Sequence, residues 1–435
     1  MSGQFEAIVT TVPGPRSHSL AATLAATEPR GVTHIAKHFP IFWESADGAL
    51  VTDVDANRYL DLSSAFGVAL TGHANPVVAA AVAEQARRLP HGMGDVHPTD
   101  VKVRLLERLA SIAPVHDART FLCANGSDAV EFALKTAMIA TGEPNVLAFA
   151  GSYHGLSYGA LEVSGITKFR KPWRRQLREG TSFTRFPDPR EPRSAERALD
   201  AVAKSLRRDR LIGAIVVEPI MGRAGVRVPP DGFMKGLRAL CTANDALLIV
   251  DEIYTGFGRT GTMFACDREG VKPDILCVGK ALGGGFPISA AIATGEVAAA
   301  WGPSDGEALH TSTYLGNPMG CAAALANLGE IERLDVPAIA RARERFIGER
   351  LQQLRRTDPR IGDIRGRGLM WAIDFKPPGL AKHVVGSALA RGLIVLQSGI
   401  HGEAIALTPS AVITDAQLER AFDILENSIH DPMTR

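Results

Sequence analysis

The sequence is poor in cysteine, with five among 435 residues. They are Cys123, Cys241, Cys266, Cys277 and Cys321, an odd number that is scattered along the chain and lies mostly inside apolar runs. Disulfide frameworks and zinc sites need cysteines in pairs or at set spacings, so this distribution argues against both. We therefore expect no metal site, and the reducing cytoplasm as the location.

The sequence also lacks an excess of charge of either sign. Its 48 Lys and Arg residues against 47 Asp and Glu residues give a formal net charge of +1 at pH 7. Such a balance provides no global field to attract nucleic acid or an anionic membrane, so we expect small-molecule partners. The basic stretch at residues 168–178 is interpreted as a solvated loop face.

Long hydrophobic runs are missing as well. No stretch approaches the roughly 20 apolar residues that a membrane-spanning helix needs. The first thirty residues mix acidic with basic side chains and contain no continuous apolar segment. We therefore expect neither a secretory nor a transit peptide.

What the chain does have is enough apolar sequence, 46% of its residues, for a large core. At roughly 100–200 residues per domain, its length predicts two or three domains. Residues 1–35 form a polar arm with a possible helix at 17–27. The alternation at residues 41–67 predicts a meander of short antiparallel strands. Residues 75–112 return to helical spacing, with Asn75-Pro76 as the helix start.

The middle of the chain repeats one pattern: a short apolar run, then polar or glycine residues, then a helical pattern. The runs are TFLCAN (120–125), VLAFAG (146–151), AIVVEP (214–219), ALLIVDE (246–252), DILCVGK (274–280) and ISAAIAT (288–294). Apolar strands separated by helices predict a largely parallel sheet that is covered on both faces. Ligands of such sheets bind beyond the carboxyl ends of the strands.

After about residue 330 the pattern changes to that of a smaller α+β unit. We expect an amphipathic helix at 331–354, a strand hairpin in GDIRGRGLMWAIDF and a closing helix at 415–429.

Residues able to do chemistry follow several of the apolar runs. Gly126 and Ser127 begin a helix whose free N–H groups could hold a phosphate, although a helix cap without a ligand is the commoner explanation of such a pair taken alone. Tyr153 and His154 follow the second run, and Tyr153 could lie on a flat ring or merely mark the boundary of the core. Glu218 ends the third run and could be catalytic or structural.

The fourth and fifth runs end in Asp251-Glu252 and Lys280. Glu218 or the carboxylate that ends the fourth run could be structural, capping a helix or pairing with an arginine such as Arg259. A lysine at the end of an apolar strand is partly desolvated, which lowers its pKa and makes its amine a nucleophile toward a carbonyl. The glycines at 283–285 leave room for a bulky ring. A phosphate site, a stacking tyrosine, an aspartate and this lysine together predict pyridoxal phosphate chemistry.

These motifs resemble those of the class III pyridoxal-phosphate-dependent aminotransferases over nearly the whole chain. NGSDAVEFA is similar to the phosphate-binding motif of that family, YHG to its ring-stacking motif, VDEIYTGFGRTG to its aspartate motif and GKALGGGFP to its Schiff-base motif. HTSTYLGNP (310–318) and GDIRGRGL match further segments. The resemblance implies the aspartate-aminotransferase-like fold, fold type I. It divides the chain into residues 1–74 (arm and part of a small domain), 75–330 (large cofactor-binding domain) and 331–435 (C-terminal small domain).

The resemblance also implies a role for each matching residue. Lys280 would form the Schiff base with pyridoxal 5'-phosphate and Asp251 would pair with the pyridine nitrogen, whereas Ile253 and Tyr153 would enclose the ring. Gly126 and Ser127 would bind the phosphate, completed by Thr313 of a neighbouring subunit in a homodimer with active sites at the interface. The cofactor site would also include His154, Glu218 and Tyr254. Phe66 would line the substrate pocket.

Two departures from the family pattern concern the substrate. Ala406 stands in AIALTPSAV where many members have an arginine that binds the α-carboxylate of glutamate and otherwise pairs with the residue matching Glu218. We expect glutamate to be a poor donor, and Glu218 to lack its counter-ion unless Arg227 or another base replaces it. A water-filled aliphatic pocket is the alternative. The second departure is Tyr254, in place of a glutamine.

The expected activity is transfer of an amino group from an amine or amino acid to a keto or aldehyde acceptor. A racemase, epimerase or aminomutase of the same family, such as the α-amino-ε-caprolactam racemases, is the alternative, since those branches share the loss of the arginine. Returning the proton to the substrate carbon would need a second acid or base, for which Tyr153 is the candidate. A non-catalytic binding protein of this fold would be expected to lack Lys280 or Asp251, and both are present.

Overall fold

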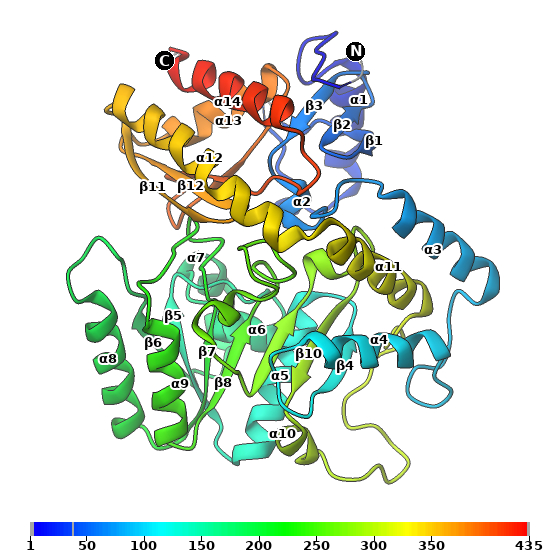
Figure 1. Ribbon diagram of the computed structural model, residues 1–435, viewed down its shortest axis with the longest axis vertical. Helices are drawn as coiled ribbons and strands as arrows, with labels where there is room; N and C mark the ends of the chain where they lie inside the picture. The colour runs from blue at the N-terminus through cyan, green and yellow to red at the C-terminus, as the bar shows by residue number, and fades with distance from the viewer. Residues whose placement is uncertain (1–3, 37–38, 433–435) are drawn as a thin grey trace.

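The computed structural model describes residues 4–36 and 39–432 of the chain. Figure 1 shows a large lower part, built on a twisted sheet with helices in front of it and behind it, and a smaller upper part formed by both ends of the chain. The prediction of a mostly parallel sheet with a smaller α+β unit is confirmed. The boundaries at 74/75 and 330/331 stay a prediction.

The large sheet has seven strands in the order β4-β10-β9-β8-β7-β5-β6. β10 pairs antiparallel with both of its neighbours, and the remaining pairs are parallel. The strands are β4 (Arg119–Cys123), β5 (Asn145–Ala150), β6 (Thr181–Arg185), β7 (Ile212–Val217), β8 (Leu247–Asp251), β9 (Ile275–Val278) and β10 (Ser289–Ala293). Six of them match the six apolar runs.

Alternate residues of each strand face opposite sides of the sheet, and each side packs on its own set of helices. In β7, Ile215 and Val217 belong to the cluster that contains buried residues of α4, α8 and α9, whereas Ala214 and Val216 belong to the cluster with α5, α6 and α10. The bounds are α4 (Asp100–Ile112), α5 (Gly126–Thr141), α6 (Tyr158–Val163), α8 (Ser194–Arg208), α9 (Phe233–Ala243) and α10 (Gly295–Ala299). The strands are therefore buried on both faces, which explains their nearly continuous apolar character.

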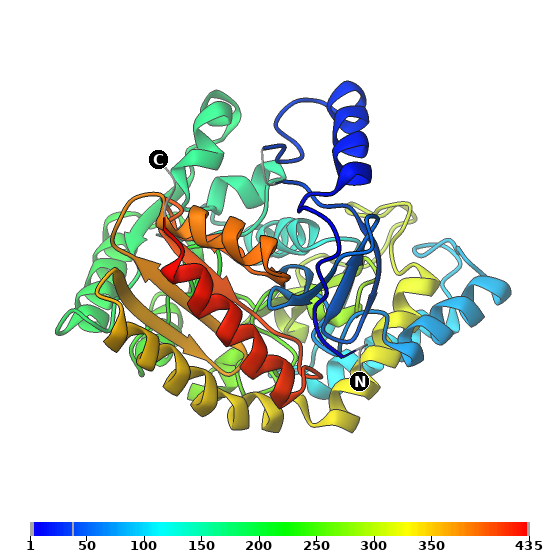
Figure 2. The same cartoon turned by 90° about the horizontal axis from the view of Figure 1, so that it is seen from above.

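The smaller part combines two four-stranded sheets, ordered β1-β2-β3-β13 and β11-β12-β15-β14. The pairing of β13 with β3 joins the C-terminal to the N-terminal segment, and Figure 2 shows the closing helix (red) beside the blue N-terminal strands. The elements are α1 (Pro15–Thr27), β1 (Trp43–Asp47), β2 (Leu50–Asp53), β3 (Arg58–Asp61), β11 (Ile361–Arg367), β12 (Met370–Phe375), α13 (Leu380–Ala390), β13 (Leu393–Ile394), β14 (Leu396–Ser398), β15 (Ala404–Leu407) and α14 (Asp415–His430). The strand meander, the hairpin and the closing helix are confirmed.

Two expected helices are divided differently. The helical pattern at 75–112 is two helices, α3 (Pro76–Arg88) and α4, and Asn75 caps the first through N–H bonds from Val77 and Val78. The helix expected at 331–354 is wrong in its start, because α11 (Pro318–Leu334) ends at Asp335 and α12 (Val336–Thr357) begins there. Asp335 has φ +49°, and a proline follows in the first turn of α12, so the chain changes direction. Among the described residues, no helix is both long and apolar enough to cross a membrane.

Candidate active site

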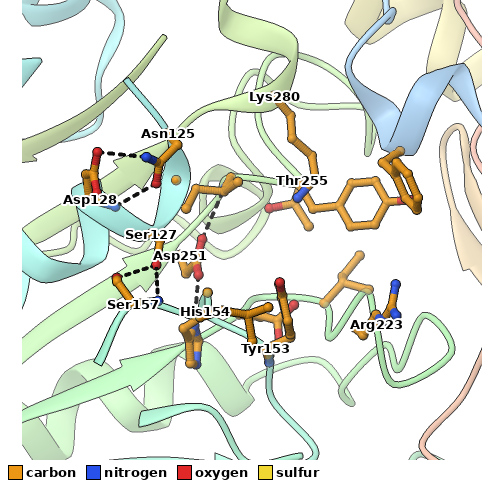
Figure 3. Close-up of a pocket in the computed structure, with 18 residues that line it drawn as sticks. Asn125, Ser127, Asp128, Tyr153, His154, Ser157, Arg223, Asp251, Thr255 and Lys280 are labelled. Carbon is orange, nitrogen blue, oxygen red and sulfur yellow. Dashed lines mark hydrogen bonds and ion pairs between the residues drawn. The ribbon is translucent and has the colours of Figure 1, made fainter. Parts of the chain in front are cut away.

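A cavity of about 690 Å³ lies beyond the carboxyl ends of the central strands. Figure 3 shows side chains from several strand ends converging on it. The predicted site residues that line it are Phe66, Gly126, Ser127, Tyr153, His154, Glu218, Asp251, Ile253, Tyr254 and Lys280. Two others do not line it: Ala406 is buried in an apolar cluster that adjoins the cavity through Ile220, and Thr313 is exposed on the segment before α11.

One end of the cavity is suited to bind an anion. The 16-residue helix α5 begins here, and the side chain of Asn125 caps it by accepting the N–H of Asp128. The N–H groups of Gly126 and Ser127 have no acceptor within the helix, and the positive end of the helix dipole faces the cavity. The Ser127 hydroxyl bonds with that of Ser157 and also accepts the Ser157 N–H at 3.0 Å.

Two glycines allow segments of the chain to approach each other closely at this end of the cavity. A Cβ at position 155, where φ is +126°, would lie 2.4 Å from Oγ of Ser127. A Cβ at position 126 would lie 2.8 Å from Cδ1 of Ile253. The close approach between Gly126 and Ile253 therefore depends on the missing side chain at 126.

A buried Asp–His pair lies deeper in the cavity. Oδ2 of Asp251 is 2.8 Å from Nδ1 of His154, and its Oδ1 accepts the N–H of Ile253 at 3.1 Å. Burial favours the neutral imidazole, but the hydrogen bond and charge of Asp251 and the charge of Glu218 raise the pKa of His154 above its usual value. The pair thus holds the Asp251 carboxylate in a fixed orientation.

Lys280 follows β9 in a strained conformation. Its φ of +37° is uncommon for a residue with a side chain, and its Nζ lies 4.5 Å from the centre of the Tyr254 ring. Burial lowers the pKa of Lys280 against the opposing charges of Asp251 and Glu218. Burial therefore shifts Lys280 toward the neutral amine that a nucleophile or base requires.

Glu218 is 6% exposed and forms no ion pair with any residue that the structure describes. Its two oxygens accept the backbone N–H groups of Tyr153, at 2.9 Å, and Gly222, at 3.0 Å. Burial raises the pKa of Glu218 to about 7, with the charge of Asp251 adding to the effect and that of His154 opposing it. Arg227, suggested as a counter-ion, instead pairs with other carboxylates, Asp374 and Glu403, so that suggestion is wrong.

Tyr254 is held between two glycines. A Cβ at either Gly67 or Gly222 would lie 2.4 Å from its ring. Its hydroxyl is 3.4 Å from Oγ1 of Thr408. The ring thus forms a fixed wall beside Lys280.

Phe66 reaches the cavity from α2 (Ser64–Gly67), which is a single left-handed turn. The φ angles of Ser64, Ala65 and Phe66 are +44°, +49° and +61°, a conformation that costs about 1–2 kcal/mol per residue with a side chain. Several bonds to Asp61 hold the turn: its Oδ1 accepts the N–H and hydroxyl of Ser63, and its Oδ2 accepts the Ala65 N–H. Strain of this kind is typical of functional sites.

Sequence reasoning missed other lining residues, namely Asn125, Asp128, Leu156, Ser157, Ile220, Arg223 and Thr255. Ser157 lies four residues after Tyr153, and Arg223 lies five residues after Glu218. Each stands in a loop that follows a strand end, and that position was the available signal.

The residues present fit a phosphate-bearing ring cofactor. Free N–H groups and two hydroxyls form an anion cradle, and a Cβ at position 155 would collide with the Ser127 hydroxyl in it. The Ile253 side chain provides an apolar surface, and an aspartate and a lysine lie within the same cavity. These are the groups that pyridoxal phosphate requires.

Comparisons with known proteins agree with this geometry. The family described as aminotransferase class-III matches residues 32–429. The 4-aminobutyrate aminotransferase of Mycobacterium leprae is 35% identical, covering 98% of this chain and 99% of its own, and the acetylornithine aminotransferase of Methanothermobacter thermautotrophicus is 36% identical, covering 90% and 94%.

A solved structure gives the same result for the fold. The PLP-bound amine transaminase of an uncultivated Pseudomonas species superposes with a TM-score of 0.86 at 29% identity, covering 93% of this chain and 98% of its own. The chain therefore belongs to the class III aminotransferases, enzymes of fold type I that transfer nitrogenous groups with pyridoxal phosphate as cofactor.

Proposed function

We propose that the enzyme moves an amino group from an amine or amino acid to a keto or aldehyde acceptor through Lys280, and that glutamate is not its preferred donor. The observation that carries the proposal is the strained lysine after β9, whose pKa is lowered and which shares one cavity with the Asp251–His154 pair and the start of α5.

Pyridoxal phosphate, when bound, supplies an aldehyde that captures amines and a ring that accepts electrons from the substrate carbon. Gly126, Ser127 and Ser157 would hold its phosphate. Asp251, fixed by His154, would keep a proton at the ring nitrogen. Ile253 and Tyr153 would enclose the ring.

Lys280 would act twice. Its amine would first hold the cofactor and, once the substrate amine has displaced it, would serve as a base next to the substrate carbon. The lowered pKa makes Nζ more readily available as the neutral amine that would take the proton from that carbon. The Tyr254 ring, whose centre lies 4.5 Å from Nζ, would limit the movement of the lysine side chain on that side.

The donor preference rests on the surroundings of Glu218 and Ala406. Ala406 packs with Ile220, Val226, Met370 and Ala372, so the position offers an α-carboxylate no cation. Glu218, an acidic group that lines the same cavity, would repel that carboxylate whenever it is ionised. We expect glutamate to be a poorer donor than alanine or simple amines in half-reaction assays, and faster conversion of glutamate would contradict this.

The racemase alternative uses Tyr153 as the second proton carrier. Burial raises the pKa of its phenol, which favours the protonated form that could deliver a proton to the substrate carbon. Single enantiomers incubated in deuterated water, with and without pyruvate, distinguish the two activities. Stoichiometric keto product supports transfer, whereas deuterium at an inverted carbon without keto product supports racemisation.

We also propose a homodimer in the cytoplasm, with Thr313 reaching the cofactor phosphate of the other subunit and with no nucleic-acid or membrane partner. The supporting observation is the exposure of the segment around Thr313, where Leu309 is 80% and Tyr314 63% exposed, since apolar exposure of this kind marks interfaces. Light scattering gives the mass in solution, and a monomer that retains full activity would contradict the proposal.

The decisive variant is Lys280→Ala. We expect it to abolish turnover and the absorbance of the lysine-bound cofactor while the protein remains folded, as circular dichroism would show. An active variant that keeps this absorbance would refute the role of Lys280.

A further inference from the structure

Arg223 stands in the loop after β7, at the side of the cavity away from the anion cradle. Its carbonyl oxygen accepts the N–H of Gly399 and the hydroxyl of Ser398, both at 3.2 Å, which fixes its main chain against the smaller part of the molecule. In Figure 3, Asn125 and Ser127 lie at one end of the cavity, Arg223 at the other and Lys280 between them.

The guanidinium of Arg223 is exposed and has no hydrogen bond or ion pair with any described residue. Its side-chain contact is with the ring of Phe169, whose centre lies 5.8 Å from Cζ. Arg227, four residues later, differs because it is paired with both Asp374 and Glu403. The loop therefore uses one arginine to bind the smaller part of the molecule and leaves the other facing the cavity.

Arg223 is the one arginine among the described residues that line this cavity. Of the other basic side chains that line the cavity, Lys280 has its amine committed to the carbonyl chemistry, and His154 is buried against Asp251. The anion cradle is committed to the phosphate. A planar guanidinium binds a carboxylate through two parallel hydrogen bonds, which a lysine does not provide.

Much of the wall of the cavity is apolar. Phe66, Leu156 and Ile220 line the cavity, together with the rings of Tyr153 and Tyr254. A substrate lying along this wall would have an apolar segment between the carbon that reaches Lys280 and the group that reaches Arg223.

We propose, building on the transferase function above, that Arg223 binds a substrate carboxylate at the mouth of the cavity. The enzyme would then select amino acids whose carboxylate is separated from the reacting amine-bearing carbon by an apolar segment. This arginine would supply the recognition that Ala406 does not.

The test compares three donors of similar size with the holoenzyme: δ-aminovalerate, which has a distant carboxylate, norvaline, which has an adjacent one, and pentylamine, which has none. For Arg223→Gln we expect the KM of δ-aminovalerate to rise about 10- to 100-fold with little change in kcat, since charge-assisted hydrogen bonds are lost. The KM and kcat for pentylamine and for norvaline should not change. Arg223→Lys should restore part of the affinity.

Arg174→Gln is the matched control, because its side chain is 82% exposed and it removes one positive charge without altering the cavity lining. A similar rise in KM for this variant would indicate general attraction and overturn the inference. Calorimetry gives a second readout that needs no turnover: valerate should bind the wild-type holoenzyme and bind Arg223→Gln at least about 10-fold more weakly.

The outcomes separate this inference from the function it rests on. If wild type uses pentylamine and Arg223→Gln handles δ-aminovalerate as well as wild type does, the inference fails and the transferase function stands. If wild type converts none of the three donors, the proposed transferase function with such donors is contradicted. The role of Arg223 is then decided by whether Arg223→Gln weakens the binding of valerate. Equal use of the acid and the amine by wild type would also contradict the inference.

Discussion

Replacing Glu218 by glutamine should change how the stability of the enzyme depends on pH. The carboxyl is buried, accepts two backbone N–H groups and forms no ion pair with any described residue. Burial raises its pKa from the ordinary 4.5 to about 7. In the unfolded chain the group ionises near its ordinary value, so between these two pKa values the folded state retains a proton that the unfolded state has lost.

The sign and size of the effect follow from this difference. A raised pKa stabilises the fold fully below about pH 4.5, and that contribution is lost as the pH rises through about 7. A rise from 4.5 to about 7 corresponds to about 3 kcal/mol. Glutamine removes the titration, although its NH₂ group fits one of the two N–H donors poorly at a cost of about 1–3 kcal/mol that does not depend on pH.

Thermal unfolding of cofactor-free wild type and Glu218→Gln at about pH 5 and about pH 8 measures the effect. Between the lower and the higher pH, the free energy of unfolding of the variant should rise relative to that of wild type by about 2–3 kcal/mol. This corresponds to a few degrees in Tm. Buried groups with raised pKa values that do not interact with Glu218, such as Glu252, contribute equally in both proteins and cancel. A difference that stays constant between the two pH values would refute the reasoning.

Two further variants test the site. Asp251→Asn keeps the shape of the side chain but removes the charge beside the ring nitrogen, so kcat should fall about 100- to 1,000-fold with cofactor still bound, and unchanged kcat in steady-state assays would contradict the role of Asp251. Asp61→Ala removes the acceptor of the left-handed turn and should cost about 2–4 kcal/mol in unfolding experiments. It should also raise KM as Phe66 becomes mobile, and a stable variant with normal KM would show that the turn does not depend on Asp61.

The core of the fold was predictable because its strands are buried on both faces and read as apolar runs. β6 was missed because it lies at the edge of the sheet and reads Thr181-Ser182-Phe183-Thr184-Arg185, without a continuous apolar run. The break at Asp335 was missed because helical spacing continues on both sides of it. Local pattern alone does not reveal a change of direction that tertiary packing imposes.

The site was predictable to the extent that its residues follow strand ends. The left-handed turn at Phe66 was not, because residues with side chains avoid this conformation and the bonds that hold it come from Asp61 and the distant Thr408. The free guanidinium of Arg223 also required the structure, since arginines at 223 and 227 look equivalent in the sequence. Their difference arises from Asp374 and Glu403, about 150 residues and more away along the chain.

The central claim is that Lys280 carries the cofactor. Borohydride reduction of the holoenzyme followed by peptide mapping and mass spectrometry tests it most directly, because reduction makes the bond between a lysine and the cofactor permanent. The cofactor-derived mass should be found on the peptide that contains Lys280. Its presence on another lysine, or its absence from the chain, would contradict the claim.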